Sequence, residues 1–453
     1  MAFVGGTVID GSGGDPLENA VVLVRGDRIQ CVGTPADCPA PDGATVVDVT
    51  GRFLTPGLVD AHVHFSQTGW LDGRPDGLPA AEVYPYLETS RANRSNPERW
   101  HRSYLCTGIT AVFDVGGHPW TTALPAAFED RDDGAHVRAA GPLVTFGGRP
   151  ELQADEEMYT FLPMGSDAEA LESVDAVAGM GSSALKVWYL RVPAQRRAEM
   201  DARLMKVGDR ARSHGLDLIV HSTGLREAKA ALRAGAKVLV HSVEDQPVDE
   251  EFLELARANG TVYLPTLLVG ENWGRAVISV AMDTPQALDD SNGCVDPNTV
   301  AKVNDTATLQ AFVPERNRGN LEYALERMRR TGQTQAVMAV NLRRVHEAGI
   351  TVATATDAGN PLTLHGPSIY NEMESMQAAG IPAAEIVVMS TRNGARAMNR
   401  EDDFGTLEAG KVADLLILAE DPTEDVRAFR SLTHVMRAGT LHEQVDLRLR
   451  PVS

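Results

Sequence analysis

The middle of the chain, residues 56–404, alternates short apolar runs with amphipathic helical stretches. The helical spacing of apolar residues is clearest at 196–214, 225–234 and 249–259. Uninterrupted runs of Val, Ile and Leu separated by helices are typical of parallel strands that helices cover. Eight such units favour a closed (β/α)8 TIM barrel over an open doubly wound sheet, within the α/β class. The runs are GLVDAHVHF, TAVFDVGG, VRAAGPLV, ALKVWYL, LDLIVHST, KVLVHSV, TVYLPTLL and ITVATATDAG.

Short strands broken by turns occupy both ends of the chain. Residues 1–55 combine β-branched residues with turn signals such as Arg25-Gly26-Asp27, and a similar pattern returns in residues 405–453. Neither segment has enough strands to bury a sheet face by itself. We therefore expect residues 1–55 plus 405–453 to form one small β-sandwich domain, and residues 56–404 to form the barrel.

The composition excludes several classes of partner. With 42 Lys and Arg against 62 Asp and Glu, the net charge of −20 disfavours nucleic acid and anionic membranes as partners. No stretch approaches the roughly 18 apolar residues that span a bilayer, and the N-terminus lacks the basic start of a signal peptide. We expect a cytoplasmic protein with a small-molecule substrate and a possible homo-oligomeric state. The four cysteines are interpreted as reduced structural thiols: Cys31, Cys38, Cys106 and Cys294.

Polar residues stand at the C-terminal ends of the predicted strands, where barrel enzymes keep their active sites. Each has an ordinary explanation by itself, such as a hydrogen-bonded core histidine or an aspartate that caps the next helix. Their coincidence on five strands instead predicts one cavity that holds Zn²⁺ or a similar divalent ion. The first strand places two imidazoles on one face, because residues i and i+2 point to the same side. The candidate ligands are His62, His64, Lys186, His221, His241 and Asp357.

The stretch from Thr55 to His64, TPGLVDAHVH, resembles the first-strand signature of the amidohydrolase superfamily. The resemblance continues through the candidate ligands into residues 390–395 and 405–416, and so covers essentially the whole chain. The most similar subgroup is that of the imidazolonepropionase-like amidohydrolases, which include dipeptidases acting on Xaa-Pro, Xaa-Arg or Xaa-Lys. The resemblance implies a metal-bearing barrel with a β-sandwich built from both termini.

The resemblance also implies a ligand set for two divalent ions, with Zn²⁺ as the expected metal. His62, His64 and Asp357 would hold the first ion, and His221 and His241 the second. Lys186, carbamylated by CO2, would bridge both ions. Mononuclear relatives lack this lysine, so its presence favours two ions.

The chemistry expected of such a site is hydrolysis. Two ions that share a water lower its pKa from about 15.7 toward 7, and the hydroxide attacks a carbonyl carbon. Asp357 would act as general base and then general acid. His365 would orient the substrate or Asp357, or would be a loop histidine without a role. Trp188 and Tyr189 would contact the substrate, and the long segments 65–96 and 270–312 would serve as lids or pocket walls.

Three functions remain open from the sequence. The first is hydrolysis of a C–N bond in an N-acyl amino acid, a dipeptide, a cyclic amide or an arylamide. The second is phosphotriesterase or lactonase chemistry on the same binuclear site. The third is a non-catalytic metal-binding scaffold, whose marker would be a missing ligand, and all six ligands are present.

Overall fold

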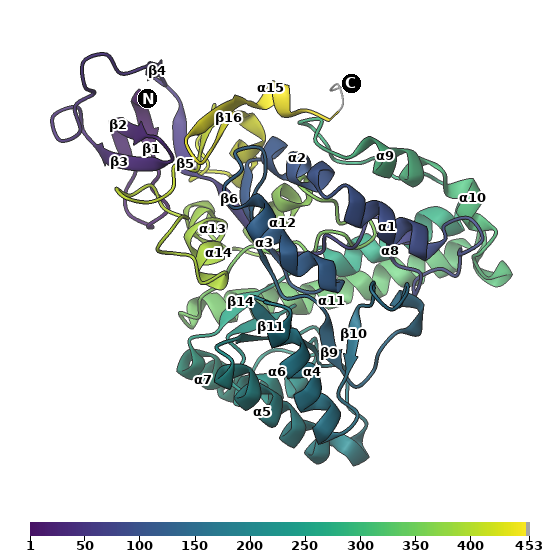
Figure 1. The fold of residues 1–453 in the computed structure, drawn as a ribbon. Coiled ribbons are helices and arrows are strands. Elements are labelled where there is room, and N and C mark those ends of the chain that lie inside the picture. Colours follow the sequence, from purple (N-terminus) through teal and green to yellow (C-terminus); the bar gives the residue numbers. More distant parts are fainter. Residues whose placement is uncertain (450–453) are drawn as a thin grey trace.

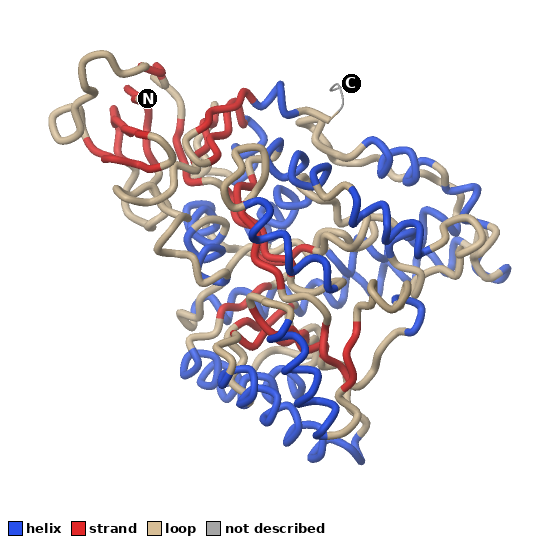
Figure 2. Tube along the Cα trace, viewed as in Figure 1, coloured by secondary structure: helices blue, strands red, loops and turns tan. Residues whose placement is uncertain are grey.

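Parallel strands run through the interior of the main body, and helices lie outside them (Figure 2). The computed structural model describes residues 1–449. Seven of the predicted apolar runs form strands here, and the third is split into β8 and β9. One sheet contains β6 (Leu58–Val63), β7 (Ile109–Asp114) and β8 (His136–Ala139). The other contains, in spatial order, β10 (Phe161–Pro163), β9 (Leu143–Thr145), β11 (Ala184–Trp188), β12 (Asp217–His221), β13 (Val238–Val240) and β14 (Val262–Leu264).

The eighth run, residues 350–359, is not a continuous strand, so this part of the prediction is wrong. Its backbone nevertheless bonds to strands on both sides: Tyr263 donates to the carbonyl of Thr351 at 2.8 Å, and Asp357 donates to that of His62 at 2.8 Å. Asp357 has a φ of 64°, a left-handed conformation that interrupts a strand. The parallel strands therefore fall into two sheets, and a single closed ring stays a prediction.

Helices follow the strands and cover them. The three helical stretches expected from apolar spacing are confirmed as α5 (Arg197–Ser213), α6 (Leu225–Arg233) and α7 (Glu250–Asn259). Helix α4 (Asp167–Gly179) begins with a capping box between Ser166 and Glu169. The remaining short helices are α1 (Tyr86–Ser95), α2 (Glu98–Cys106), α3 (Leu124–Phe128), α12 (Ser368–Ala378), α13 (Ala383–Met389), α14 (Arg392–Ala397) and α15 (Gln444–Leu447).

The segment 270–312, expected as a long loop, is largely helical. It contains most of α8 (Val269–Ala281), all of α9 (Pro297–Asn304) and all of α10 (Thr306–Gln310), and the long α11 (Leu321–Glu347) follows. Two aspartates of the segment are helix caps, because Asp296 and Asp305 each accept a bond from the first turn that follows, and Asn320 caps α11 in the same way. Helices α8 and α11 pack together and cover one side of the main body (Figure 1).

Both ends of the chain contribute to one sheet at a corner of the molecule (Figure 1). Its spatial order is β17-β16-β15-β5-β1-β2-β3, with β4 beside β1. Strand β15 pairs antiparallel with β5 and so joins the two ends. Within residues 1–449 these strands are hydrogen-bonded into one sheet, so the sandwich and the domain boundaries stay predictions. The strands are β1 (Ala2–Val8), β2 (Leu17–Arg25), β3 (Arg28–Gly33), β4 (Val46–Asp48), β5 (Phe53–Pro56), β15 (Leu415–Leu418), β16 (Leu432–Arg437) and β17 (Thr440–Glu443).

A buried polar contact links this sheet to the main body. His136 at the start of β8 lies 3.0 Å from the carboxylate of Asp414, and Arg437 of β16 donates to the carbonyl of Gly134. Burial alone would raise the pKa of Asp414, but His136 and Arg437 beside it hold that pKa below its usual range. The contact therefore fixes the sheet against the main body through charges that water does not reach.

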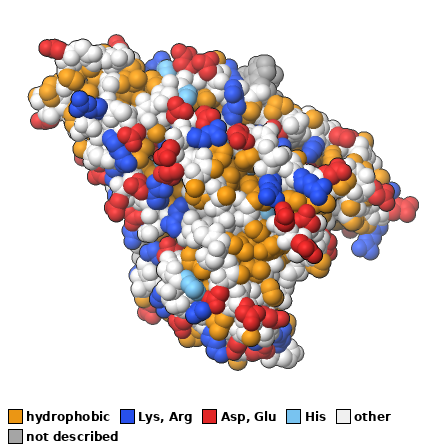
Figure 3. Space-filling model, viewed as in Figure 1, with side chains coloured by type: hydrophobic (Ala, Val, Ile, Leu, Met, Phe, Trp, Pro, Cys, Tyr) orange, Lys and Arg blue, Asp and Glu red, His pale blue; other side chains and the backbone are white. Residues whose placement is uncertain are grey.

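The surface carries acidic and basic side chains interspersed over the face that Figure 3 draws. Among residues 1–449, none of the helices combines the length and apolar character that a membrane crossing requires.

The four cysteines form two disulfides, Cys31–Cys38 and Cys106–Cys294, so the prediction of reduced thiols is wrong. The second bond joins residues 188 apart in sequence, at the end of α2 and before α9, and no local pattern reveals such a pairing. Both of its cysteines are buried.

Removal of Cys106–Cys294 is expected to cost more stability than removal of Cys31–Cys38. In the chain-entropy model, closing a loop with a separation of 188 contributes about 5 kcal/mol, against about 2 kcal/mol for a separation of 7. Thermal midpoints of Cys106→Ala/Cys294→Ala and Cys31→Ala/Cys38→Ala, measured side by side, check this order. Equal midpoints would contradict it.

Candidate metal centre

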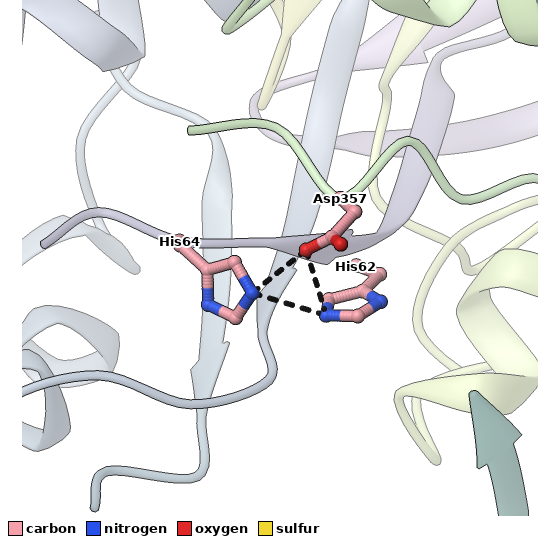
Figure 4. Close-up of side chains that lie close together, drawn as sticks. All are labelled: His62, His64 and Asp357. Atoms are coloured by element: carbon pink, nitrogen blue, oxygen red, sulfur yellow. Dashed lines mark hydrogen bonds and ion pairs between the residues drawn. The ribbon is translucent and has the colours of Figure 1, made fainter. Parts of the chain in front are cut away.

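Three side chains from two segments meet at the end of β6 (Figure 4). The Nε2 atoms of His62 and His64 lie 3.2 Å apart. Oδ1 of Asp357 lies 2.8 Å from Nε2 of His64 and 3.3 Å from Nε2 of His62. All three residues are buried, with 1–7% of their surface exposed. The alternation of β6 brings the two imidazoles together, and the left-handed turn at Asp357 aims its carboxylate at them.

The hydrogen bonds around this cluster leave lone pairs facing one another. Nδ1 of His64 lies 2.5 Å from the carbonyl oxygen of Gly116, which only accepts, so Nδ1 carries a proton. In the neutral ring, Nε2 then presents a lone pair toward Oδ1 of Asp357, which has no hydrogen-bond partner among residues 1–449. Two facing lone pairs repel unless a cation lies between them. The donor set therefore fits a divalent metal ion.

Two further histidines and a lysine lie beside this cluster. The rings of His221 and His241 are 4.4 Å apart, and that of His241 is 5.3 Å from His62. His241 follows β13 with a φ of 74°, a strained conformation of the kind that persists at functional sites. Lys186 points into the same cavity from β11 and is 2% exposed.

Burial sets the charges of these groups. It lowers the pKa values of His62, His221 and His241 well below the usual range, so their imidazoles are neutral at pH 7. It also lowers the pKa of Lys186 to about 7, which leaves much of the amine uncharged. Burial alone would raise the pKa of Asp357, but His64, His241 and Lys186 hold it below its usual range. Neutral imidazole and anionic carboxylate are the forms that bind metals.

A cavity of about 530 Å³ opens from this cluster, large enough for a small organic molecule. Trp188, which was expected to contact the substrate, lines it and stacks on Phe161 with ring centroids 5.1 Å apart. Helix α8 forms another wall through Glu271 and Trp273, which agrees with the expected role of segment 270–312.

Tyr189 and His365 lie outside the cavity lining. Tyr189 points the opposite way from Trp188 and donates to Asp201 of α5 at 2.6 Å. The ring of His365 contacts the hydroxyl of Tyr104 at 2.7 Å and the carbonyl of Gln67 at 3.1 Å. The predicted contact of Tyr189 with substrate is therefore corrected, because this side chain packs behind the strand. His365, expected to orient the substrate or Asp357 or to have no role, instead bonds to Tyr104 and to the backbone of the segment after β6.

Three polar residues of the site had no role in the sequence prediction. Asp114, at the end of β7, accepts from the amides of Phe65 and Gly116, and burial raises its pKa to about 6. Arg74 and Asn360 line the cavity and hydrogen-bond to each other. The strand-end position of Asp114 was a usable signal, whereas nothing in the sequence pairs Arg74 with Asn360.

Comparison with known proteins places this site in a family. Residues 53–441 match the model of the amidohydrolase family. The chain belongs to the amidohydrolase family. It is 26% identical to imidazolonepropionase of Caulobacter vibrioides over 95% of this chain and 93% of that protein. It is 24% identical to ochratoxinase of Aspergillus niger over 96% of this chain and 85% of that protein.

The fold is likewise that of solved amidohydrolase structures. A Xaa-Pro dipeptidase with methionine bound in its active site superposes with a TM-score of 0.73 at 21% identity, covering 98% of this chain and 99% of that one. This likeness implies a TIM-barrel fold with an additional domain.

In this amidohydrolase, Thr266 is expected to position His241. Its hydroxyl lies 2.6 Å from Nδ1 of His241, and its own φ of 43° is held by the following amides of Leu267 and Leu268, which donate to the buried carboxylate of Glu372. Thr266→Ala should lower metal affinity or activity by about 10- to 100-fold, because the imidazole loses its orienting partner. Metal titration and initial rates check this. Thr266→Ser keeps the hydroxyl and should retain the wild-type values; equal loss in both variants would contradict the role.

Proposed function

We propose that this amidohydrolase hydrolyses a C–N bond of a small substrate with the help of two divalent metal ions, preferably Zn²⁺. The observation that carries the proposal is the convergence of four imidazoles, a carboxylate and an amine on one cavity, where all but the half-buried His221 are buried. Burial holds the pKa values of His62, His221 and His241 low, so these imidazoles are neutral, and Oδ1 of Asp357 lacks a hydrogen-bond partner among the described residues.

The ligands divide into two sets. His62, His64 and Asp357 would hold one ion, because their ligand atoms already lie together. His221 and His241 would hold the second. Lys186 would bridge the ions as a carbamate, formed when its amine nitrogen bonds to the carbon of CO2 and releases a proton. A pKa of about 7 supplies the neutral amine that this reaction needs.

The residues of the chain have distinct tasks in hydrolysis. When bound, the ions would polarise the carbonyl oxygen of the substrate and make a water molecule more acidic. Asp357 would accept the proton of that water at its carboxylate and pass it to the leaving nitrogen. Trp188 and Phe161 would hold an apolar part of the substrate against the wall and exclude water. Closure of the strands into one barrel, supported by the bonds of residues 350–359 to both β14 and β6, would keep these groups in register.

The relatives support an amide substrate. The names imidazolonepropionase, ochratoxinase and Xaa-Pro dipeptidase denote proteins similar to this one over nearly its full length. We infer an N-acyl amino acid, a dipeptide, a cyclic amide or an arylamide as the substrate. Phosphotriesterase or lactonase chemistry is the second candidate, since the same ligands would serve it, and a metal-binding scaffold is the third.

A substrate screen with a metal control tests the proposal. The metal-loaded protein should hydrolyse at least one of a set of N-acyl amino acids, dipeptides, cyclic amides and arylamides. Chelation should reduce the rate by more than about 100-fold, and Zn²⁺ should restore it. Preference for a phosphotriester or lactone would select the second candidate. Full metal content with no hydrolysis of any compound would contradict the catalytic proposal.

Location and assembly stay predictions. Disulfides persist mainly in oxidising compartments, so Cys31–Cys38 and Cys106–Cys294 weigh against the predicted cytoplasmic location.

Self-association is supported by an exposed apolar stripe on α11, formed by Leu321, Leu325 and Met328. Light scattering with Leu325→Lys tests the stripe, and an unchanged mass would exclude it.

A further inference from the structure

One face of α11 forms the wall of the cavity. The residues that line it recur at helical spacing and therefore lie on one side of the helix. They are Arg327, Arg330, Thr331, Thr334, Gln335 and Met338. The helix thus presents two guanidinium groups at one end of this face and the apolar Met338 at the other.

Arg327 differs from the other cations of this cavity. Arg74 forms a bidentate pair with Asp76, with distances of 2.8 and 2.9 Å, and Arg330 is paired with Glu326 at 2.6 Å. Lys186 lies among the candidate metal ligands. Arg327 has no hydrogen bond or ion pair to any of residues 1–449, and its Nε is buried without a partner.

The helix itself offers Arg327 no carboxylate. The residues three and four positions away are Tyr323, Ala324, Arg330 and Thr331. The acidic residues of the cavity do not compensate either: Glu271 accepts from Gln335 at 2.6 Å, and Glu244 forms no ion pair with Arg327. A buried donor without an acceptor destabilises the protein, so binding of an anion by Arg327 would remove this unfavourable free energy.

We propose that Arg327 binds a carboxylate of the substrate within the cavity that the candidate metal ligands also line. A guanidinium donates two parallel bonds to a carboxylate, which gives orientation as well as affinity. The lining of the same cavity also carries Trp188, Phe161 and Met338, which suit an apolar side chain. Resting on the proposed function, this selects amides that bear a free carboxylate over neutral amides. The carboxylate belongs either to the released amine, as in an N-acyl amino acid, or to the acyl part.

Matched pairs of compounds that differ only in charge test the proposal. N-acetyl-L-phenylalanine and its carboxamide place the group on the amine side, and succinanilic acid and its carboxamide place it on the acyl side. Both pairs are titrated calorimetrically into the metal-loaded protein, and kcat/KM is measured where a compound is hydrolysed. The wild type should prefer one carboxylate over its carboxamide by about 10- to 100-fold.

Substitutions of Arg327 test whether this residue causes the preference for a carboxylate. Arg327→Gln should bring the ratio close to one, and Arg327→Lys should keep part of it, because an ammonium retains the charge without the fork. Arg329→Gln is the matched control, since Arg329 is paired with Glu326 and does not line the cavity. A ratio in Arg327→Gln equal to that of the wild type would overturn the proposal, as would a wild type that prefers neither carboxylate.

The outcomes separate this inference from the proposed function. Hydrolysis of acetanilide with no carboxylate preference would remove only the role of Arg327. A preference that Arg327→Gln abolishes, in a protein that hydrolyses no amide, would leave the anion site in place and remove the hydrolase.

Discussion

Asp357→Asn is expected to lower kcat by about 10²- to 10⁴-fold. The change replaces an anionic ligand by a neutral amide at the point where His62 and His64 converge. The amide neither accepts the proton of a nucleophilic water nor returns it to the leaving nitrogen. Its NH2 group also places a donor against the ligand atoms of the two histidines, which weakens binding of the first metal. Initial rates and metal content by mass spectrometry measure both effects.

The control for this variant is Asp209→Asn, on the exposed surface of α5. It should retain wild-type rate, metal content and thermal midpoint. Full activity of Asp357→Asn would contradict the proposed role of the carboxylate. Loss of the fold is excluded by comparing the thermal midpoints of the two variants.

Lys186→Ala is expected to abolish the second metal site and nearly all hydrolysis. The lysine is the one candidate ligand that would contact both ions, so its removal deprives each of an anionic oxygen. The cavity lining also loses its most deeply buried amine. Metal content should fall from two ions per chain to one or fewer, as measured on the purified protein.

A second measurement tests the carbamate itself. Protein equilibrated with ¹³C-labelled bicarbonate should show a carbamate carbon signal that is absent in Lys186→Ala and in Lys186→Arg, whose guanidinium stays protonated and does not react with CO2. Lys206→Ala, at an exposed position on α5, should keep the signal. Two bound ions and full activity in Lys186→Arg would rule out the bridging carbamate.

Short sequence patterns are enough to place most of the site residues. Period-two alternation in VDAHVH is enough to place His62 and His64 on one face, because a strand allows no other arrangement. The same rule, applied to β11, turns Tyr189 away from the cavity when Lys186 and Trp188 face it, and the structure shows this orientation. The error at Tyr189 was thus avoidable from the sequence.

Other errors were not avoidable. The partners of His365 are Tyr104, 261 residues earlier, and the backbone of Gln67. The Cys106–Cys294 bond and the contact between Arg74 and Asn360 span comparable distances along the chain. Segment 270–312 was expected to be a loop, but Asp296 and Asp305 cap helices whose stability comes from packing against the main body.

Local spacing by itself determined the parallel strands, the helices between them and the strand ends at which the candidate ligands stand. It did so because strand and helix periods are properties of short segments. Only the tertiary structure decided which polar atoms are left without partners. Arg327 cannot be distinguished from any other arginine of a polar helix until the cavity and its neighbours are in place. Likewise, Nε2 of His64 has no proton to donate to Oδ1 of Asp357 because the carbonyl of Gly116, 52 residues away in sequence, holds the proton at Nδ1. Whether a polar atom is satisfied depends on every group within reach of it, and those groups come from distant parts of the chain.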